Sequence, residues 1–357
     1  MFDKNLMVLE HFMHRSGPMS GLSKQSRRRS DLMKLLVDIG LNTERKGLLT
    51  ETVRRSGIEV FFVDEATPDQ KNECEALLQS FGDQRRIADN VASARKLRMM
   101  QTISAGVDRL PFDSIPPEVT VCSNAGAFSA PIAEHTFAMV LGLAKRLKLN
   151  EMRMISGQFD QETRTVELRG KVLGVLGYGG IGKAVAAVGK CLGMKVYGIS
   201  RNGSDAAACD YHGDLRKLDD MLSKSDVVVV AIPLNRETNG LIDKQKLSLM
   251  KDDAILVNVA RAHIIVERDL YEHLKENPSF YAGIDAWWHE PRRDQKFSGN
   301  LDFISLPNVI GSPHNSGIVE GMNEYVVSRA FENIARFASG KTPHNIVRRE
   351  DYINRTG

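Results

Sequence analysis

The segment KVLGVLGYGGIGKAVAAVGKCLGMKVYGISRN spans residues 171–202. Its apolar run at residues 172–176 predicts a buried strand, which ends in the glycine-rich turn at residues 177–182. A helical pattern then extends to Leu192, and a second strand is expected at residues 195–199. A strand, a glycine-rich turn, a helix and a strand in this order predict the first half of a dinucleotide-binding unit.

The glycines of this turn have separate expected roles. Gly177 permits the tight turn, Gly179 lets the backbone approach a pyrophosphate, and Gly182 lets the helix pack on the strand. The N–H groups at the helix start then face the phosphates. A GxGxxG alone also occurs in unrelated α/β turns, but a strand on each side favours nucleotide binding. The expected cofactor contacts of the turn are Tyr178, Gly179, Gly180 and Ile181.

The residues after the second strand predict which nicotinamide nucleotide is preferred. An NAD enzyme places a carboxylate about 20 residues beyond the glycines, where it binds the ribose hydroxyls. This chain has Ser200, Arg201 and Asn202 at that position, and Asp205 comes only later. With no carboxylate to repel a 2′-phosphate and an arginine to bind it, NADP(H) is predicted to be preferred over NAD(H).

Composition narrows the class of protein. The 357 residues exceed one typical domain, and the hydrophobic fraction of 42% with 26% charged residues is that of an ordinary globular protein. The net charge of +3 does not suggest a nucleic-acid partner, and no apolar run approaches the ~20 residues that span a bilayer. The four cysteines show no CxxC spacing, so reduced thiols and a cytoplasmic location are expected.

The chain before the nucleotide unit predicts a smaller parallel α/β lobe. Residues 1–30, with the basic cluster at 24–29, are expected to be a poorly ordered extension; an organelle transit peptide is the alternative. Strands are expected at residues 58–63, 97–103 and 119–122, and residues 32–40 are compatible with a strand or a helix. A helical segment should extend to Arg55, and further helices should begin near Pro68 and Asp83. A long amphipathic helix at residues 131–149 is expected to bridge the lobes or to form a dimer contact. A single helical histidine is more often structural, so His135 is left out of the site.

Beyond residue 202 the alternation of strands and helices continues, which predicts a doubly wound parallel sheet. Strands are expected at residues 227–232, 254–259, 280–284 and 308–311, with helices at residues 242–250, 267–275 and 318–339. Ligands bind beyond the carboxyl ends of such strands. Further cofactor contacts are therefore expected at Pro233, Val259 and Ala260.

Three polar side chains follow neighbouring strands of this sheet. Arg261, Glu290 and His314 each have an ordinary structural interpretation, but together at one edge they predict a site. Arg261 can grip a substrate carboxylate with its planar fork, and His314 can donate a proton to a carbonyl oxygen. Glu290 would orient the imidazole and stabilise its charged form. The predicted reaction is reversible hydride transfer between a nicotinamide and a 2-keto or 2-hydroxy acid, with no metal.

At this point the chain resembles the D-2-hydroxyacid dehydrogenase family. The resemblance rests on the motifs ISAGVDRL (103–110), NAGAFSAPIAEHTFAMVLGL (124–143), LGYGGIGKAVA (176–186), AIPLNRETNGLI (231–242), VNVARA (257–262), DAWWHEP (285–291) and SPHNSG (312–317). It implies that Arg261 orients the substrate, that Glu290 pairs with His314, and that His314 donates the proton. It also implies that Asp285 receives the nicotinamide carboxamide. The backbone amides of Ser104, Ala105 and Gly106 would hold the substrate carboxylate.

The resemblance also implies the domain arrangement. A Rossmann cofactor domain at residues 129–312 would lie between the two parts, 31–128 and 313–357, of a smaller flavodoxin-like α/β substrate domain. The protein would be a homodimer that uses the helix at residues 131–149. There are departures from the family pattern. Ala262 stands where glycine is usual, and the apolar strand expected before the helix leading to Leu97 is hard to find, because FGDQRRIADNV (81–91) is too polar to be that strand. Arg85 and Arg86 in that segment are candidates for an extra anionic contact, with solvent exposure the alternative.

The leading functional prediction is a reductase of glyoxylate, hydroxypyruvate or a similar small 2-keto acid. A formate dehydrogenase is a second possibility because of Trp287 and Trp288, but that branch of the fold carries glutamine in place of Glu290. A third is a nucleotide-sensing regulator of the same fold, which can keep the same arginine, glutamate and histidine.

Overall fold

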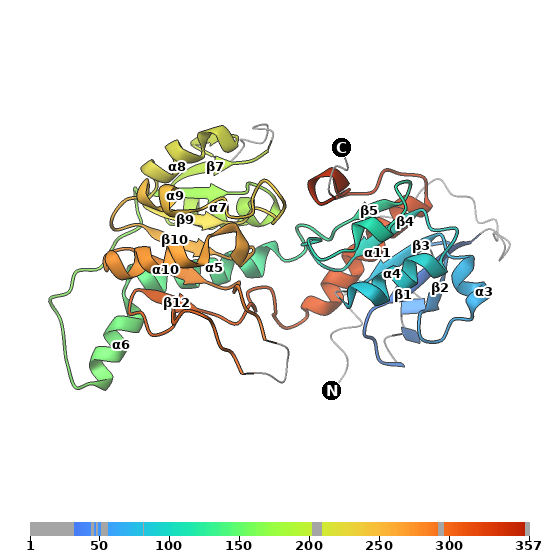
Figure 1. Ribbon diagram of the computed structural model, residues 1–357, viewed down its shortest axis with the longest axis horizontal. Helices are drawn as coiled ribbons and strands as arrows, with labels where there is room; N and C mark the ends of the chain where they lie inside the picture. Colours follow the sequence, from blue (N-terminus) through green and yellow to red (C-terminus); the bar gives the residue numbers. More distant parts are fainter. Residues whose placement is uncertain are drawn as a thin grey trace. The chain divides into compact units, whose positions relative to one another are not determined.

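The computed structural model describes residues 32–43, 46–47, 49–50, 56–80, 82–201, 209–291 and 296–353. The chain forms two compact units (Figure 1). Unit 1 contains the chain up to Ala127 and from Glu320 onward, and unit 2 contains Phe128–Val319. Residues 313–319, which were expected in the C-terminal return, therefore belong to unit 2, and the return to unit 1 begins at Glu320. The N-terminal extension at residues 1–30 lies outside the described residues.

Unit 2 is built on a sheet in which every paired strand is parallel to its neighbours. The strand order is β12-β11-β10-β9-β6-β7-β8, so the order reverses between β6 and β9. This is the doubly wound arrangement predicted from the sequence. The strands are β6 Val172–Leu176, β7 Lys195–Ile199, β8 Tyr211–Gly213, β9 Val227–Val230, β10 Ile255–Asn258, β11 Tyr281–Ile284 and β12 Val309–Gly311.

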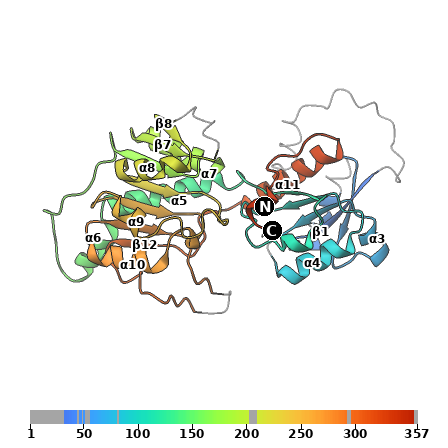
Figure 2. The ribbon, with the colours of Figure 1, turned by 45° about the horizontal axis from the view of Figure 1, so that its top comes forward.

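Helices cover both faces of this sheet (Figures 1 and 2). They are α5 Ser129–Ala144, α7 Gly180–Cys191, α8 Leu218–Lys224, α9 Lys244–Ser248 and α10 Glu267–Glu276, whereas α6 Leu147–Ile155 projects from the body of the unit. In β9, Val227 and Val229 join the core under α5 and α7, whereas Val228 and Val230 join the core under α8, α9 and α10. Because successive strand side chains point to opposite faces, a strand covered on both sides is apolar throughout.

The long helix expected at residues 131–149 is two helices. α5 ends at Ala144, and α6 begins at Leu147. Between them Arg146 takes a positive φ of 53°, which ends the regular helix. The guanidinium of Arg146 lies 5.7 Å from the ring centre of Tyr281, so a cation–π contact accompanies the break. The two halves also differ in burial, since α5 is largely buried and α6 has no buried residue.

Unit 1 has a five-stranded parallel sheet in the order β2-β1-β3-β4-β5, which is the flavodoxin-like order. Its elements are β1 Met33–Asp38, β2 Ile58–Phe62, α3 Pro68–Asn72, β3 Ala76–Gln79, α4 Gln84–Ser93, β4 Met99–Thr102, β5 Thr120–Cys122 and α11 Met322–Ala338. β3 is the strand that the sequence did not reveal; it has four residues, all buried, between two helical patterns. α11 closes the unit, and its Ala330, Phe331 and Ile334 pack against strand residues of one face. The expected helical segment toward Arg55 falls partly outside the described residues.

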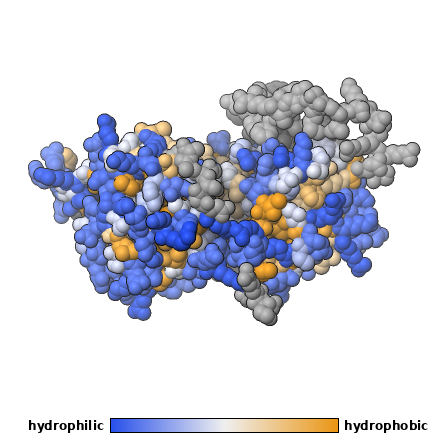
Figure 3. Space-filling view, turned by 90° about the horizontal axis from the view of Figure 1, so that it is seen from above, coloured by the Kyte–Doolittle hydropathy of each residue, from blue (hydrophilic) through white to orange (hydrophobic). Residues whose placement is uncertain are grey.

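In the part of the chain that the structure describes, no helix is both long and apolar enough to span a bilayer. The face drawn in Figure 3 is mostly hydrophilic, with hydrophobic residues scattered over it.

Candidate active site

The turn between β6 and α7 forms an open cradle of backbone. Gly177 has a φ of +104°, and a Cβ at this position would lie 2.4 Å from the backbone N of Ile232. A Cβ on Gly182 would lie 2.1 Å from the carbonyl oxygen of Gly177, so the helix reaches the strand only without a side chain. A Cβ on Gly179 would meet nothing within 4 Å, and Gly179 and Gly180 are exposed. α7 begins at Gly180 without a side-chain cap. This open helix N-terminus fits the pyrophosphate of a dinucleotide.

The next expected cofactor contacts lie beside the end of β7. The side chain of Tyr178 is buried, and its ring meets the His212 ring edge-on at 5.7 Å. Only the backbone of Tyr178 is therefore available to a ligand. Ser200 Oγ lies 3.2 Å from His212 Nε2, and Arg201 is exposed. Asn202 and Asp205 lie outside the described residues.

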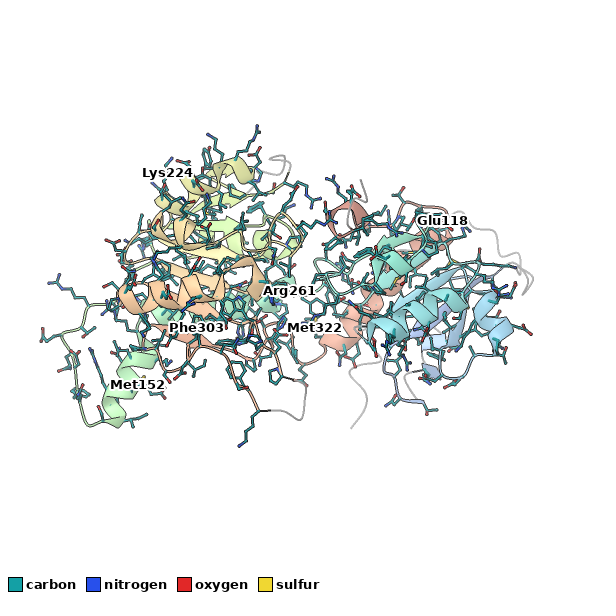
Figure 4. All side chains as sticks on the ribbon, in the orientation of Figure 1. Glu118, Met152, Lys224, Arg261, Phe303 and Met322 are labelled. Carbon is teal, nitrogen blue, oxygen red and sulfur yellow. The ribbon has the colours of Figure 1, made fainter. Side chains whose placement is uncertain are left out.

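The ends of β9 and β10 carry the contacts expected nearer the nicotinamide. Pro233 is exposed, Val259 is buried, and Ala260 is half-buried. Arg261 lies three residues beyond β10, and its Nη1 donates to the carbonyl oxygen of Ala260 at 2.9 Å (Figure 4). The side-chain amide of Asn258 donates to the Arg261 carbonyl, also at 2.9 Å, which holds the backbone at this point.

Ala262, where the family usually has glycine, causes no backbone strain. It opens a short 3-10 helix, Ala262–Ile264, and is buried. Among the described residues, the non-glycine positions with positive φ are Arg146, His314 and Asn345, so Ala262 has an ordinary conformation. The extra methyl is accommodated by the local packing.

His314 and Glu290 form a direct pair. His314 Nδ1 lies 2.6 Å from Glu290 Oε1, and the side chains keep 35% and 27% exposure, so the pair remains open to a ligand. Because a carboxylate only accepts, the hydrogen of this bond is on Nδ1, and Nε2 remains for a reactant. The backbone N–H of Trp287 donates to the same Oε1 at 3.3 Å. The pair and Arg261 come from the carboxyl ends of the adjacent strands β10, β11 and β12.

Asp285 directly follows β11, and its side chain is fully buried. Its Oδ1 accepts from Ser312 Oγ at 2.5 Å and from the Asn315 N–H at 3.1 Å, and its Oδ2 accepts from the Ser316 N–H at 3.4 Å. The role assigned to it by resemblance, contact with the nicotinamide carboxamide, would have to use the less occupied Oδ2. In this structure its evident task is to hold the turn at residues 312–316.

The residues expected to hold the substrate carboxylate, Ser104, Ala105 and Gly106, follow β4 in unit 1. Ser104 Oγ donates to the carbonyl oxygen of Gly106 at 2.9 Å, which closes this loop on itself. Arg86, the candidate for an extra anionic contact, instead binds Asp38 through Nε and Nη2 and also reaches Asp64. Arg85 is exposed.

Sequence reasoning missed three residues beside the pair. His135 Nε2 lies 2.8 Å from Ser312 Oγ, and the indole N–H of Trp287 donates to the carbonyl oxygen of Ser312 at 2.7 Å. The position of Ser312 two residues before His314 was the available signal. Among the described residues, no group of three or more histidine, cysteine or acidic side chains could hold a metal ion.

An arginine and an acid-held histidine at neighbouring strand ends, with an open dinucleotide cradle on the same doubly wound sheet, are typical of a Rossmann-fold oxidoreductase. Residues 137–316 match the family described as D-isomer specific 2-hydroxyacid dehydrogenase, NAD binding domain. The chain belongs to the D-isomer specific 2-hydroxyacid dehydrogenase family. It is an NAD(P)-dependent oxidoreductase that acts on a CH–OH group.

Relatives and solved structures agree with this assignment. Glyoxylate reductase of Aeropyrum pernix is 31% identical over 271 residues, which cover 73% of this chain and 79% of that protein. The structure of a Pyrobaculum aerophilum protein, described provisionally as a formate dehydrogenase, is 32% identical, covers 90% of this chain and 100% of that chain, and has a TM-score of 0.76. D-lactate dehydrogenase of Aquifex aeolicus, solved with NAD and lactic acid, is 26% identical, covers 86% and 96%, and has a TM-score of 0.65.

Proposed function

We propose that this protein is an NADPH-preferring reductase of a small 2-keto acid such as glyoxylate or hydroxypyruvate. The observation that carries the proposal is the 2.6 Å contact between His314 Nδ1 and Glu290 Oε1, at the edge of the sheet where Arg261 follows the adjacent strand β10. Reduction of a carbonyl group needs a proton for the new hydroxyl as well as a hydride, and an imidazole held by a carboxylate can donate that proton. The glyoxylate reductase relative supports the choice of a small substrate.

The proposed roles rest on the chemistry of these side chains. Arg261 grips the substrate carboxylate with its guanidinium and polarises the neighbouring carbonyl. Nε2 of His314 donates a proton to the carbonyl oxygen, while Glu290 holds the ring through Nδ1 and stabilises the imidazolium before the transfer. When bound, the reduced nicotinamide supplies the hydride.

The preference for NADPH rests on the residues after β7. Ser200 and the exposed Arg201 occupy the positions where an NAD enzyme places a carboxylate, and His212 adjoins Ser200. A neutral hydroxyl and a guanidinium can both donate hydrogen bonds to a 2′-phosphate, whereas a carboxylate would repel it.

Formate oxidation is the second candidate, favoured by the Pyrobaculum aerophilum structure. Formate becomes carbon dioxide by giving up a hydride alone, so no hydroxyl proton has to be moved. A glutamate-held histidine adds nothing essential to that reaction. The pair of His314 and Glu290 therefore favours a 2-keto acid over formate.

The deciding experiment is a steady-state assay of glyoxylate, hydroxypyruvate, pyruvate and formate, each with both nicotinamide nucleotides. The proposal expects reduction of a small 2-keto acid, with the higher kcat/KM on NADPH. Turnover of formate alone would establish the second candidate. Binding of NADPH without turnover of any substrate would indicate a nucleotide-sensing regulator and overturn the proposal.

We also propose that the protein is a homodimer that pairs through α6. Met152 (Figure 4), Met154 and Ile155 on this helix are 46%, 63% and 81% exposed, and Phe159 beyond it is 77% exposed. Apolar side chains gathered in this way mark an interaction surface. Ile155→Glu is expected to yield monomers in sedimentation velocity, whereas the control Leu249→Glu, at an exposed position on another part of unit 2, should leave the dimer intact.

A further inference from the structure

A hydrogen-bonded chain of three side chains, of which Asp285 is buried and His135 and Ser312 are half-buried, lies beside the turn that carries His314. It runs from His135 on α5 through Ser312 to Asp285. His135 Nε2 lies 2.8 Å from Ser312 Oγ, and Ser312 Oγ lies 2.5 Å from Asp285 Oδ1. His135 and Asp285 themselves are 3.8 Å apart, so the hydroxyl of Ser312 is the link between them. α5 packs against β11 and β12, and this packing brings His135 to the turn.

The direction of these hydrogen bonds follows from the donors around Asp285. Its carboxylate already accepts from the backbone N–H groups of Asn315 and Ser316, so it acts as an acceptor toward Ser312 as well. The single hydroxyl hydrogen of Ser312 is then directed to Asp285. Ser312 Oγ must in turn accept from His135, which places a hydrogen on His135 Nε2.

The turn that these hydrogen-bonded side chains contact has a strained backbone at His314. His314 has a φ of +51°, in the left-handed region that non-glycine residues rarely adopt. Such a conformation persists only where the surroundings enforce it. The Asp285 carbonyl accepts from the His314 N–H at 2.9 Å, while the Asp285 carboxylate binds the turn before His314, at Ser312, and after it, at Asn315.

We propose that His135 is a positioning residue for His314, acting through Ser312 and Asp285. The inference rests on the proposed function of His314 as the proton donor. His135 fixes the orientation of the Ser312 hydroxyl, so that this hydroxyl keeps its short hydrogen bond to Asp285. The strained turn is thereby held in the conformation that places the His314 ring against Glu290. Without His135 the hydroxyl can rotate, and the turn relaxes away from the left-handed conformation.

The test compares His135→Leu, which removes the donor, with His135→Gln, whose amide N–H can reach the same hydroxyl. Misplacement of a reacting group by about 1 Å can cost about 100-fold, so His135→Leu is expected to lower kcat by about 10- to 100-fold. The dissociation constant for NADPH should stay unchanged, and His135→Gln should restore most of kcat. The solvent deuterium isotope effect on kcat should rise in His135→Leu, because proton delivery becomes slower than the hydride step.

Ser312→Ala provides a second approach that does not depend on how His135 variants fold. It should lower kcat as His135→Leu does, and the double variant should be no slower than Ser312→Ala, because both act through one chain. Nitrogen-15 NMR of the ligand-free protein should show the hydrogen of neutral His135 on Nε2. The inference would be overturned if the fold-losses in kcat of the two single variants multiplied in the double variant, or if the hydrogen of His135 were on Nδ1.

His314→Ala separates this inference from the proposed function. If His314→Ala loses turnover while His135→Leu and Ser312→Ala keep normal kcat, the positioning role fails and the proton donor stands. If His314→Ala keeps normal turnover, the proposed function itself fails. A lower melting temperature in His135→Leu with an unchanged kcat and isotope effect would show a merely structural role and would also overturn the inference.

Discussion

His314 Nδ1 and Glu290 Oε1 lie 2.6 Å apart, although 24 residues separate them along the chain. The bond assigns a hydrogen to Nδ1 and leaves Nε2 as the reacting nitrogen of the ring. The pair lies beyond two adjacent parallel strands, β11 and β12, and this adjacency creates it.

Removal of the imidazole tests the central element of the site. His314→Ala is expected to lower kcat by about 10²–10⁴-fold, the range that general acid catalysis contributes, with little change in NADPH affinity. Glu290→Gln should lower kcat by a smaller factor, because the imidazole of His314 remains but loses the carboxylate that orients it and stabilises its charged form. Steady-state kinetics and a fluorescence titration of NADPH measure both. His289→Ala is the matched control, since its ring contacts Asn300 and lies outside the pair; a comparable loss there would contradict the assignment.

The proposed 2′-phosphate contact is tested at Arg201. Arg201→Ala is expected to weaken NADPH binding by about 10- to 100-fold, the equivalent of one charged hydrogen bond of about 1.5–3 kcal/mol. Binding of NADH, which has no 2′-phosphate, should change little. Arg216→Ala is the control, because Arg216 is already paired with Asp214 in an exposed position. Equal losses for both nucleotides in Arg201→Ala would argue against the phosphate contact.

Lys148 at the start of α6 has a structural role that can be measured. Its Nζ donates to the carbonyl oxygens of Ile304, Leu306 and Val309, at 2.7, 3.1 and 2.9 Å, and burial lowers its pKa. Lys148→Met should lower the free energy of unfolding by about 2–3 kcal/mol, because three carbonyl oxygens, two of them in part-buried hydrogen bonds, lose a charged donor. In the control Lys145→Met, where the exposed lysine donates to a single carbonyl, that of Val166, the loss in urea unfolding should be smaller. Equal losses would contradict this account.

Acid stability is predicted from Asp38 in unit 1. Burial alone would raise its pKa, but hydrogen bonds from Arg86, Gln79 and Asn90 keep the pKa below its ordinary value. The stability it contributes is therefore complete above the unfolded pKa of about 3.9 and is lost as the pH falls through the lower folded value. Asp38→Asn should be less stable than the wild type at pH 6, and the difference should shrink in melts below pH 4. A difference independent of pH would refute this.

Local patterns in the chain predicted much of the fold. The strands β6 and β7 and the glycine turn between them were predicted at their observed positions, because apolar runs and a GxGxxG spacing express short-range geometry. β3 escaped prediction, since four buried residues between two helical patterns carry too short a signal. The break at Arg146 also escaped, because the apolar pattern continues across it while the backbone does not.

The sequence by itself determined that the unit binds a dinucleotide and that Arg261, Glu290 and His314 follow neighbouring strands. It could do so because parallel strands present their carboxyl ends at one edge, so the order of residues along the chain implies their grouping. Only the tertiary structure decided that Asp285 is buried under the turn and that His135 reaches Ser312, 177 residues away. Such contacts depend on how α5 packs on the sheet. The periodicity of apolar residues along the chain does not show which individual side chains come into contact when a helix packs on a sheet.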